Sequence, residues 1–330
     1  MKVAVLGAGA WGTALSVALS GHHRISLWTR DPAQCRKLEA GRVNVRYLPG
    51  VVIPGSVRIT ANAGSAIADS DLIVIAVPTS ALREALRMIT AARSAAGVVW
   101  LCKGFEAGSA KFPHQVAEEE LPPAQPRAAL SGPSFANEVA RGLPAAVTLA
   151  SRDPQFAASA SRELHTGRFR VYSSDDLIGV ETGGAVKNVI AIAAGVCDGL
   201  ELGASARAAL ITRGLAEITR LGMRLGGRGE TFIGLAGAGD LMLTATSDLS
   251  RNRRVGLQLA RGRPLPSILA ELGHVAEGVN TAREVRRLAG ELEVDMPITA
   301  AVSQLLDGAA TPLDVVEGLL QRGPKQESVR

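Results

Sequence analysis

The sequence predicts an α/β domain built on a doubly wound parallel sheet, followed by a second domain that is almost entirely helical. Three observations support this. Short apolar runs alternate with helix-like segments in the first half of the chain, a glycine-rich turn follows the first run, and long Ala- and Leu-rich segments fill the second half. Apolar runs buried on both faces are typical of parallel strands covered by helices. A chain of 330 residues also exceeds what one hydrophobic core usually organises.

The strands are predicted in the first domain, residues 1–174. The seven apolar runs are KVAVLG, RISLW, DLIVIAV, GVVWLC, RAALSG, AAVTLA and FRVYSS. Segments such as SALREALRMITAARSAA lie between them and are predicted as helices. In the second domain, residues 175–330, helices are predicted over 177–198, 205–222, 248–261, 281–292 and 297–306. The polar tail QRGPKQESVR is expected to be loosely ordered.

The composition indicates an ordinary globular protein with small anionic ligands. Hydrophobic residues make up 47% and charged residues 20% of the chain, and the formal net charge is +5. Basic residues are scattered and aromatic residues make up only 3%, which favours small phosphorylated ligands over nucleic acid. The sequence shows no secretory signal and no window of roughly 20 apolar residues, so we expect a soluble, cytoplasmic protein without a membrane span.

The cysteines and histidines indicate a reducing compartment and no metal site. Cys35, Cys102 and Cys197 are widely spaced, and His22 and His23 are not joined to cysteines or carboxylates at zinc-ligand spacing.

The first glycine-rich turn predicts a dinucleotide site. Gly7, Gly9 and Gly12 form G-x-G-x-x-G directly after a predicted strand and at the start of a predicted helix. Gly7 permits the tight turn, Gly9 lets a pyrophosphate approach the backbone, and Gly12 permits close packing of helix on strand. The helix N-terminus then faces the phosphate charge. The alternative is a glycine turn that binds no ligand.

The end of the second strand favours NADP(H) as the cofactor. RISLW is followed by Thr29, Arg30 and Asp31. An NAD site usually has an acidic residue at this point to hold the ribose 2′-hydroxyl, whereas arginine suits a 2′-phosphate. NAD(H) remains open because Asp31 follows, and Arg30 could also be a solvated loop residue.

Two further strands end in polar residues. VPTS follows DLIVIAV, and CKG, which contains Lys103, follows GVVWL. Open α/β sheets bind their ligands at the carboxyl ends of the strands, so we expect Lys103 to point toward the cofactor crevice. An ordinary strand-end lysine is the alternative.

Lys187 lies in an unusually apolar stretch, ETGGAVKNVIAIAAG. In a helix its neighbours on the same face are Gly183, Gly184, Ile190 and Ala191, with no carboxylate among them. Burial lowers the pKa of a lysine toward the range in which it can donate and accept protons. The alternative is a lysine at a helix edge whose stem lies on apolar surface while its ammonium reaches water.

Asp240 is the single carboxylate of the apolar run GLAGAGDLMLTAT, which also contains Thr244. A lone carboxylate and a lone lysine in two apolar runs are natural partners, and we expect Asp240 and Lys187 to meet across a domain interface.

The segment SRNRR follows and suggests a phosphate site. Ser250, Arg251 and Asn252 supply hydrogen-bond donors, and arginine can hold phosphate oxygens bidentately. The alternative is a helix N-cap at Ser247 or Ser250 followed by a solvated basic face.

Together these blocks resemble the bacterial NAD(P)-dependent glycerol-3-phosphate dehydrogenase family. The resemblance covers about residues 1–310, in order, through GAGAWGTAL, NVRYLPG, VPTSALRE, CKG, SGPSFANEV, KNVIAIAAG, AALITRGLAE, GLAGAGDLMLTATSDLSRNRRVG, EGVNTA and MPI. It implies an N-terminal Rossmann domain and an all-α C-terminal domain like that of 6-phosphogluconate dehydrogenase. It also implies reversible hydride transfer between a nicotinamide cofactor and the dihydroxyacetone phosphate/sn-glycerol 3-phosphate pair, for phospholipid biosynthesis.

The resemblance also implies roles for individual residues. Lys187 would be the catalytic acid/base, assisted by Lys103 and Asp240. The substrate would contact Lys103, Gly132, Ser134, Lys187, Asp240, Thr244, Ser250, Arg251 and Asn252. The cofactor would contact Gly7, Gly9, Ala10, Trp11, Gly12, Arg30, Tyr47, Lys103, Ala136, Arg251, Val275 and Glu277.

Three positions depart from the family pattern. The sequence also leaves two alternative functions open, a hydroxy-acid dehydrogenase and a regulator. Ala10 stands where serine is frequent, Ser205 where asparagine is common and Ala245 where cysteine is common. A dehydrogenase for small hydroxy acids would not need SRN, and a regulator that only binds NADPH would not need Lys187 and Asp240 in apolar settings. A homodimer is compatible with the sequence, which does not determine the oligomeric state.

Overall fold

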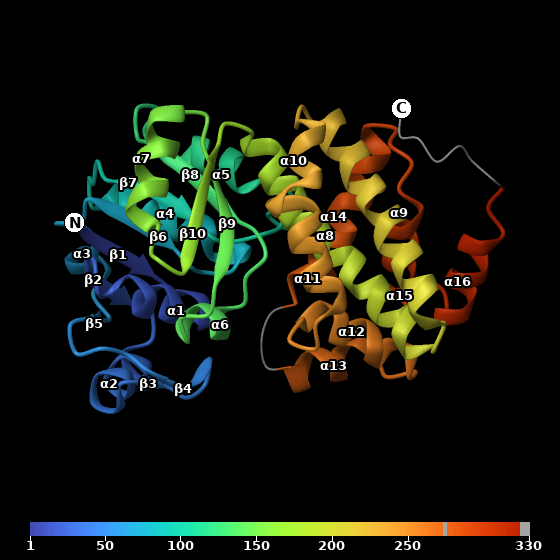
Figure 1. The fold of residues 1–330 in the computed structure, drawn as a ribbon, viewed down its shortest axis with the longest axis horizontal. Coiled ribbons are helices and arrows are strands. Elements are labelled where there is room, and N and C mark those ends of the chain that lie inside the picture. Colours follow the sequence, from blue (N-terminus) through green and yellow to red (C-terminus); the bar gives the residue numbers. More distant parts are fainter. Residues whose placement is uncertain (273–275, 324–330) are drawn as a thin grey trace. The chain divides into compact units, whose positions relative to one another are not determined.

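The computed structural model describes residues 1–272 and 276–323. By its internal contacts the chain divides into two compact units, shown as a ribbon in Figure 1. The first unit comprises Met1–Cys102 and Lys111–Leu177, and the second comprises Lys103–Ala110 and Ile178–Arg330 as far as the latter is described. Lys103 therefore belongs to the helical unit, although the strand that precedes it belongs to the first unit.

The first unit is built on an eight-stranded sheet. Its strands are β1 (Lys2–Leu6), β2 (Arg24–Trp28), β5 (Arg58–Thr60), β6 (Leu72–Ile75), β7 (Gly97–Trp100), β8 (Arg127–Ser131), β9 (Ala145–Ala150) and β10 (Phe169–Ser174). They follow the order β10-β9-β8-β7-β6-β1-β2-β5. The order changes direction between β1 and β6, and this is the point at which doubly wound sheets bind ligands. The predicted doubly wound domain is confirmed.

One part of the sheet is not parallel, contrary to the prediction. Strand β9 runs antiparallel to β8, with Leu130 opposite Leu149, whereas β10 is parallel to β9. Parallel neighbouring strands are usually joined by a crossover that contains a full helix. The β8–β9 connection contains only the five-residue helix α6 (Ala136–Ala140), so the chain returns directly.

Helices cover both faces of the sheet. They are α1 (Ala10–Leu19), α2 (Pro32–Gly41), α3 (Ala63–Ile67), η1 (Thr79–Ala81), α4 (Leu82–Ala91), α5 (Pro113–Glu120), α6 and α7 (Pro154–Leu164). Helix α1 packs against α6 and α4 against α5, and the two pairs lie on opposite sides of the sheet in Figure 1. A small hairpin of β3 (Val43–Asn44) and β4 (Leu48–Val52), which the sequence did not predict, follows α2.

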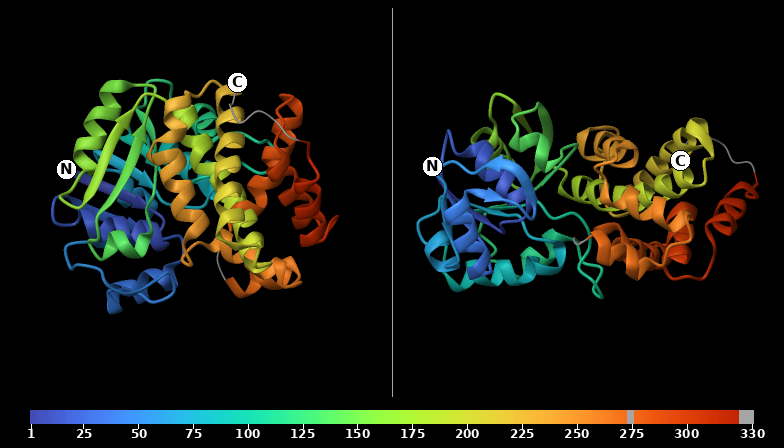
Figure 2. Two further views of the ribbon diagram at one scale, coloured as in Figure 1. Left: turned by 45° about the vertical axis from the view of Figure 1, so that its right-hand side comes forward. Right: turned by 90° about the horizontal axis from the view of Figure 1, so that it is seen from below.

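The described part of the second unit is helical, as predicted. It contains α8 (Leu177–Gly199), α9 (Gly203–Arg224), α10 (Gly229–Ile233), the π-helical turn η2 (Leu235–Gly239), α11 (Asp240–Thr246), α12 (Arg251–Ala260), α13 (Leu265–Leu272), α14 (Glu277–Glu291), α15 (Pro297–Leu306) and α16 (Pro312–Leu320). Helix α14 packs against α15 and α15 against α16, as the orange and red helices of Figure 2 show. The sequence did not predict α10, η2, α11, α13 or α16.

Helix α8 is the buried core helix of this unit. Its length and a window mean hydropathy of 1.4 would suffice to cross a membrane, although the sequence predicts no such segment. However, 89% of that window is buried inside the protein, which is typical of the core helix of a globular fold. The apolar character of α8 therefore reflects packing against other helices.

Candidate active site

The three glycines of the first unit have the geometry that a dinucleotide-binding turn requires. Gly7 has φ +114°, and a Cβ there would lie 2.8 Å from the Ala76 carbonyl oxygen. A Cβ on Gly12 would lie 1.9 Å from the Gly7 carbonyl oxygen, so only glycine permits this approach of α1 to β1. A Cβ on Gly9 would have no atom within 4 Å. The backbone is tight at Gly7 and Gly12 and open at Gly9, which fits a pyrophosphate beside the start of α1.

Two side chains that the sequence did not single out hold this turn. The amides of Asn44 and Gln34 both donate to the Ala8 carbonyl oxygen, at 3.0 and 2.9 Å. Asn44 also donates to the Thr13 hydroxyl at 2.8 Å and is buried. The hairpin β3–β4 and helix α2 are thereby tied to the glycine turn. A polar residue at the start of NVRYLPG was the available signal for Asn44.

Arg30 and Asp31 differ in how much their side chains are engaged. The Asp31 carboxylate caps α2 by accepting a hydrogen bond from the Ala33 N–H at 2.8 Å. The Arg30 side chain is 79% exposed and lies 3.9 Å from the carboxylate of Glu84. The acidic group at this strand end therefore serves the helix, while the arginine is accessible to a ligand.

The remaining predicted residues of the first unit lie at strand or helix ends. Ala10 and Trp11 open α1, whose first backbone N–H groups have no acceptor within the helix. Gly132 follows β8 with φ +142°, and the Ser134 hydroxyl donates to its carbonyl oxygen at 3.0 Å. Ala136 begins α6 and packs with Ala14 and Leu48. Tyr47 lies in the β3–β4 turn, where the Arg46 guanidinium stacks over its ring.

In the second unit, Lys187 is buried and has polar partners. Its side chain is 8% exposed, and its Nζ donates to Asp240 Oδ1 at 2.5 Å and to Thr244 Oγ1 at 2.7 Å. The alternative of a lysine at a helix edge with its ammonium in water is therefore wrong. Lys187 and Asp240 do meet, as predicted, but both lie within the second unit and not across a domain interface.

A glycine one turn before Lys187 lets Asp240 approach. A Cβ on Gly183 would lie 2.5 Å from the Ala236 carbonyl oxygen, so the turn η2 packs directly on the backbone of α8. Asp240 follows η2 as the first residue of α11. The small neighbours of Lys187 thus make room for the segment that carries its carboxylate.

Asp240 bridges two lysines. Its side chain is 1% exposed; Oδ1 accepts from Lys187, and Oδ2 accepts from Lys103 Nζ at 2.7 Å. Desolvation lowers the pKa of Lys187 to about 8, while Asp240 opposes this shift and Lys103 adds to it. A lysine with this pKa can both donate and accept a proton near neutral pH.

The SRN segment forms the start of α12. Ser250 is its N-cap, with Oγ accepting from the Arg253 N–H at 3.2 Å. The Asn252 amide donates to Asn188 Oδ1 at 2.9 Å, and its Oδ1 accepts from the Gly278 N–H at 3.1 Å. The predicted N-cap alternative is thus correct for Ser250, but the residues that follow are not simply a solvated face, because Asn252 is buried.

Arg251 differs from its neighbours. Within residues 1–272 and 276–323 its side chain makes no hydrogen bond or ion pair. Desolvation lowers the pKa of its guanidinium, and the negative charge of Glu277, the first residue of α14, opposes that shift. Val275 lies outside the described residues. Asn188, adjacent to Lys187, was not predicted; its polar side chain in an apolar run was the signal.

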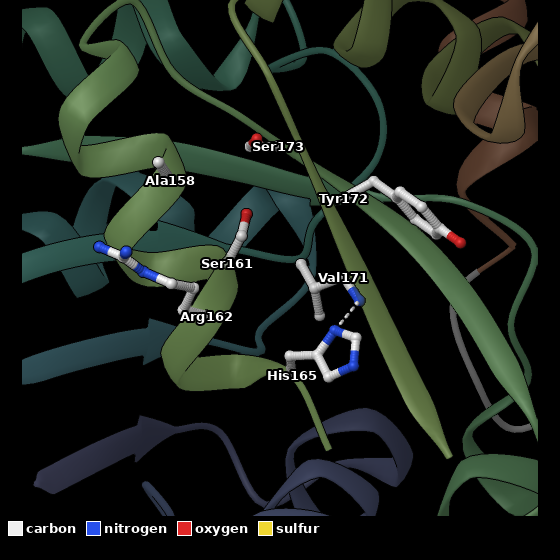
Figure 3. Close-up of a pocket in the computed structure, with 7 residues that line it drawn as sticks. All are labelled: Ala158, Ser161, Arg162, His165, Val171, Tyr172 and Ser173. Atoms are coloured by element: carbon white, nitrogen blue, oxygen red, sulfur yellow. Dashed lines mark hydrogen bonds between the residues drawn. The ribbon is translucent and has the colours of Figure 1, made fainter. Parts of the chain in front are cut away.

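No predicted site residue lines the pocket in Figure 3, which lies in the first unit between α7 and β10. There the His165 ring nitrogen Nδ1 accepts from the Val171 N–H at 3.3 Å, where β10 is an edge strand. Side-chain cover of this kind protects an open sheet edge, so the pocket has a structural explanation.

Across the described ranges, His, Cys, Asp and Glu form no group of three or more that could hold a metal ion.

Comparison with known sequences decides the family. The pattern of the NAD-dependent glycerol-3-phosphate dehydrogenase N-terminus matches residues 2–157, and that of the C-terminus matches residues 176–317. The chain belongs to the NAD-dependent glycerol-3-phosphate dehydrogenase family. A protein named glycerol-3-phosphate dehydrogenase (NAD(P)+) from Nitrosospira multiformis is 59% identical over 331 residues, covering 99% of both chains. A relative of the same name from Dechloromonas aromatica is 58% identical over 327 residues, again covering 99% of both.

Solved structures agree with this family. The crystal structure of glycerol-3-phosphate dehydrogenase from Coxiella burnetii superposes with a TM-score of 0.92 at 41% identity, covering 97% of this chain and 98% of that one. A D-mandelate dehydrogenase complex shares the fold alone, with a TM-score of 0.65 at 14% identity, 96% of this chain and 99% of that one being covered. The fold is therefore common to several dehydrogenases, whereas the sequence match is specific to this family.

Proposed function

We propose that the protein catalyses the reversible NAD(P)H-dependent reduction of dihydroxyacetone phosphate to sn-glycerol 3-phosphate. Membership of the family supports this reaction, and the observation that carries it is the group formed by the buried Lys187 and Asp240 with the partly buried Lys103. A carbonyl reduction needs a proton donor and positive charge near the developing oxyanion. These two lysines supply both.

The residues of the second unit divide this work. When bound, the nicotinamide cofactor supplies the hydride. Lys187, held by Asp240 and Thr244, donates the proton to the substrate oxygen and in the reverse direction accepts it. Lys103 polarises the same carbonyl. Asp240 fixes both ammonium groups, because each of its oxygens accepts from one of them.

The phosphate of the substrate is assigned to the start of α12. Among the described residues no side chain is hydrogen-bonded to the Arg251 guanidinium, whose planar fork suits bidentate binding of phosphate oxygens. Ser250 and Asn252 flank it; the Asn252 amide has one donor hydrogen left after its bond to Asn188. Gly132 and Ser134 are further proposed substrate contacts. Binding the phosphate converts remote binding energy into alignment of the carbonyl carbon.

The cofactor is assigned mainly to the first unit, which we propose as the NAD(P)-binding domain, with the helical unit as the substrate and catalytic domain. The open backbone at Gly9 and the start of α1 at Ala10 and Trp11 would hold the pyrophosphate. Arg30 would hold the 2′-phosphate, so NADP(H) is favoured over NAD(H). The remaining cofactor contacts are assigned to Tyr47, Lys103, Ala136, Arg251, Val275 and Glu277.

Absorbance of the reduced cofactor tests this function. Protein mixed with NADPH and dihydroxyacetone phosphate should oxidise the cofactor, and unphosphorylated dihydroxyacetone should react far more slowly. A protein that instead prefers 2-keto acids would be a hydroxy-acid dehydrogenase. One that binds NADPH without turnover of any of these substrates would be a regulator.

Two variants identify the proton donor in the same assay. Lys187→Ala should lose about 10²–10⁴ in single-turnover rate, while NADPH binding, followed by fluorescence, is retained. Lys187→Arg should fail almost as badly, because a guanidinium does not release its proton. Near wild-type turnover of the arginine variant would leave Lys187 with a charge role only and make Lys103 the next candidate donor.

The wider setting is also proposed. The product would feed phospholipid biosynthesis, and the protein would be cytoplasmic; no disulfide joins Cys35, Cys102 and Cys197, which are all within the described residues. A homodimer is also proposed, and the second unit has large apolar side chains that are exposed, among them Ile233, Met242 and Leu249, at 75, 54 and 53%. Sedimentation of the full chain would show either a monomer or a dimer.

A further inference from the structure

Arg253, two residues after Arg251, is buried and ion-paired. Its side chain is 10% exposed. Its Nε and Nη2 lie 2.8 and 2.7 Å from Asp198 Oδ2, and its Nη1 donates to Asp248 Oδ1 at 2.6 Å. Its neighbour Arg254 is exposed, and its side chain has no ion pair or hydrogen bond within the described ranges. Two adjacent arginines of one sequence motif thus have opposite surroundings.

Asp198 lies on the helix of the proposed proton donor. It follows Lys187 by about three turns of α8 and therefore shares its face of the helix. Its Oδ1 also accepts from Arg207 of α9 at 2.8 Å. The Asp198–Arg253 pair consequently joins the helix that carries Lys187 to the first turn of the helix that carries Arg251.

The two helices are in direct backbone contact beside this pair. A Cβ on Gly195 of α8 would lie 2.0 Å from the Arg253 carbonyl oxygen, and a Cβ on Gly256 of α12 would lie 2.0 Å from the Ile192 carbonyl oxygen. Neither helix can move closer, and the ion pair prevents them from sliding apart or rotating. Because α12 begins at Arg251, a small rotation would displace the guanidinium at its start.

We propose that Arg253 and Asp198 are positioning residues, which fix the phosphate-binding turn at Ser250 to Asn252 relative to Lys187. This inference rests on the proposed role of Arg251 in holding the substrate phosphate. Arg253 does not contact the substrate itself, because its donors are directed at Asp198 and Asp248. Its bond to Asp198 sets the distance and angle between the phosphate group and the carbonyl oxygen that Lys187 protonates.

A purely structural ion pair would behave differently. Removing one partner of a buried pair destabilises a protein by leaving an uncompensated charge, whatever the pair positions. Loss of stability alone would reduce the amount of active enzyme but leave the KM for dihydroxyacetone phosphate unchanged. A positioning pair predicts a change in the properties of the folded enzyme, selective for the phosphorylated substrate.

The experiment compares Arg253→Gln, Asp198→Asn and the double variant with two matched controls. Arg254→Gln removes the neighbouring exposed arginine, and Arg207→Gln removes the other partner of Asp198 while Arg253 stays paired. Steady-state kinetics with NADPH are measured for dihydroxyacetone phosphate and for unphosphorylated dihydroxyacetone, and folding is followed by thermal unfolding. We expect kcat/KM for the phosphorylated substrate to fall by up to about 10²-fold, mainly through KM, in the first three variants. The controls and the activity toward dihydroxyacetone should change little.

The double variant and a lysine variant keep the test decisive if a single variant fails to fold. Asp198→Asn with Arg253→Gln leaves no unpaired charge between α8 and α12, and Arg253→Lys keeps the charge but not the planar fork. We expect both to fold, and the lysine variant to regain part of the lost kcat/KM. A folded double variant with the wild-type KM for dihydroxyacetone phosphate would overturn the proposal, as would equal losses for both substrates.

A separate variant distinguishes this outcome from failure of the proposed phosphate site. Arg251→Ala should abolish the preference for the phosphorylated substrate. If it does so while the Arg253 variants do not, the phosphate site stands and the positioning role is wrong. If Arg251→Ala leaves the preference intact, the phosphate is held elsewhere and the assignment on which this proposal rests is wrong.

Discussion

At the scale of single residues, the chemistry depends on one carboxylate that serves two ammonium groups. Asp240 is 1% exposed and accepts from both Lys103 and Lys187. The group as a whole has a net positive charge, so it is suited to a substrate oxygen that becomes negative. The side chains of Lys187 and Asp240 are only 8 and 1% exposed, so water screens that charge weakly.

The pKa of Lys187 predicts how the reduction depends on pH. Desolvation is the main cause that lowers this pKa to about 8, and the negative charge of Asp240 acts in the opposite direction. Proton donation requires the charged form, so kcat/KM for dihydroxyacetone phosphate should decline as pH rises through about 8. Asp240→Asn removes the group that raises the pKa, so the decline should begin at a lower pH. A pH–rate profile of both proteins checks this; an unshifted or upward-shifted limb would contradict it.

Arg30 provides a second prediction, for cofactor choice. A charge-assisted contact to the 2′-phosphate contributes roughly 1.5–3 kcal/mol, or about 10- to 100-fold in affinity. Arg30→Ala should weaken NADPH by that factor and NADH little, because NADH lacks the group. Fluorescence titration with both cofactors measures this, and Glu84→Gln serves as a control that removes only the 3.9 Å ion pair. Equal losses for the two cofactors would mean that Arg30 recognises another part of the molecule.

The sequence predicted these residues where local physics dictates the residue type. Only glycine fits at Gly7 and Gly12, and an isolated lysine or carboxylate in an apolar run needs a partner, which is why Lys187 and Asp240 could be paired in advance. The partners of Asn44, Asn188 and Arg253 could not be predicted in the same way, because each partner lies far away in the chain. From the segment SRNRR alone, the buried Arg253 cannot be distinguished from the exposed Arg254.

At the scale of elements, helix α15 begins on a buried carboxylate from another helix. Glu217 of α9 accepts from the backbone N–H groups of Ile298 and Thr299, at 2.6 and 3.1 Å, and from the Thr299 hydroxyl at 3.1 Å. A carboxylate at a helix N-terminus satisfies groups that otherwise have no acceptor. This contact joins α9 to α15 within the second unit.

The pKa of Glu217 makes this contact sensitive to pH. Burial raises the pKa to about 7, against the opposing effect of its hydrogen bonds. The pKa of Glu217 is higher in the folded protein than the value of about 4.5 in the unfolded chain. The contribution of Glu217 to the free energy of unfolding is therefore fully present below pH 4.5 and is lost as pH rises through 7. The change is about 3 kcal/mol. Glu217→Gln cannot titrate, so its unfolding free energy, measured in urea between pH 4.5 and 8, should vary less than that of the wild type.

The elements themselves were predictable in proportion to their length and periodicity. Long apolar helices such as α8 and the central strands were predicted, whereas β3, β5 and α10 are too short to show a period. The antiparallel orientation of β9 was not predicted, because an apolar strand has the same residue pattern whether it runs parallel or antiparallel to its neighbour. The π-helical turn η2 depends on Gly183 of α8 and on Gly237, whose Cβ would lie 2.1 Å from the Phe232 carbonyl oxygen, and is therefore set by packing.

At the scale of the whole molecule, an excess of positive charge meets anionic ligands. The chain has 36 Lys and Arg against 31 Asp and Glu, a formal net charge of +5. A phosphate monoester has about −1.5 to −2 charge at pH 7. Long-range attraction therefore raises the rate at which the substrate reaches the protein, in addition to the local contact with Arg251.

This attraction predicts that salt lowers kcat/KM for the phosphorylated substrate more than for the unphosphorylated one. Screening shortens the range of charge interactions from about 10 Å at 0.1 M salt to 3 Å at 1 M. The kcat/KM for dihydroxyacetone phosphate should therefore fall as sodium chloride is added at constant NADPH saturation. Dihydroxyacetone, which has no charge, should be affected much less, and Arg251→Ala should show a shallower slope for the phosphorylated substrate than the wild type does. If both substrates lost activity in parallel, salt would be acting on the protein or on cofactor binding, and the positive charge of the molecule would have no part in capturing the phosphate.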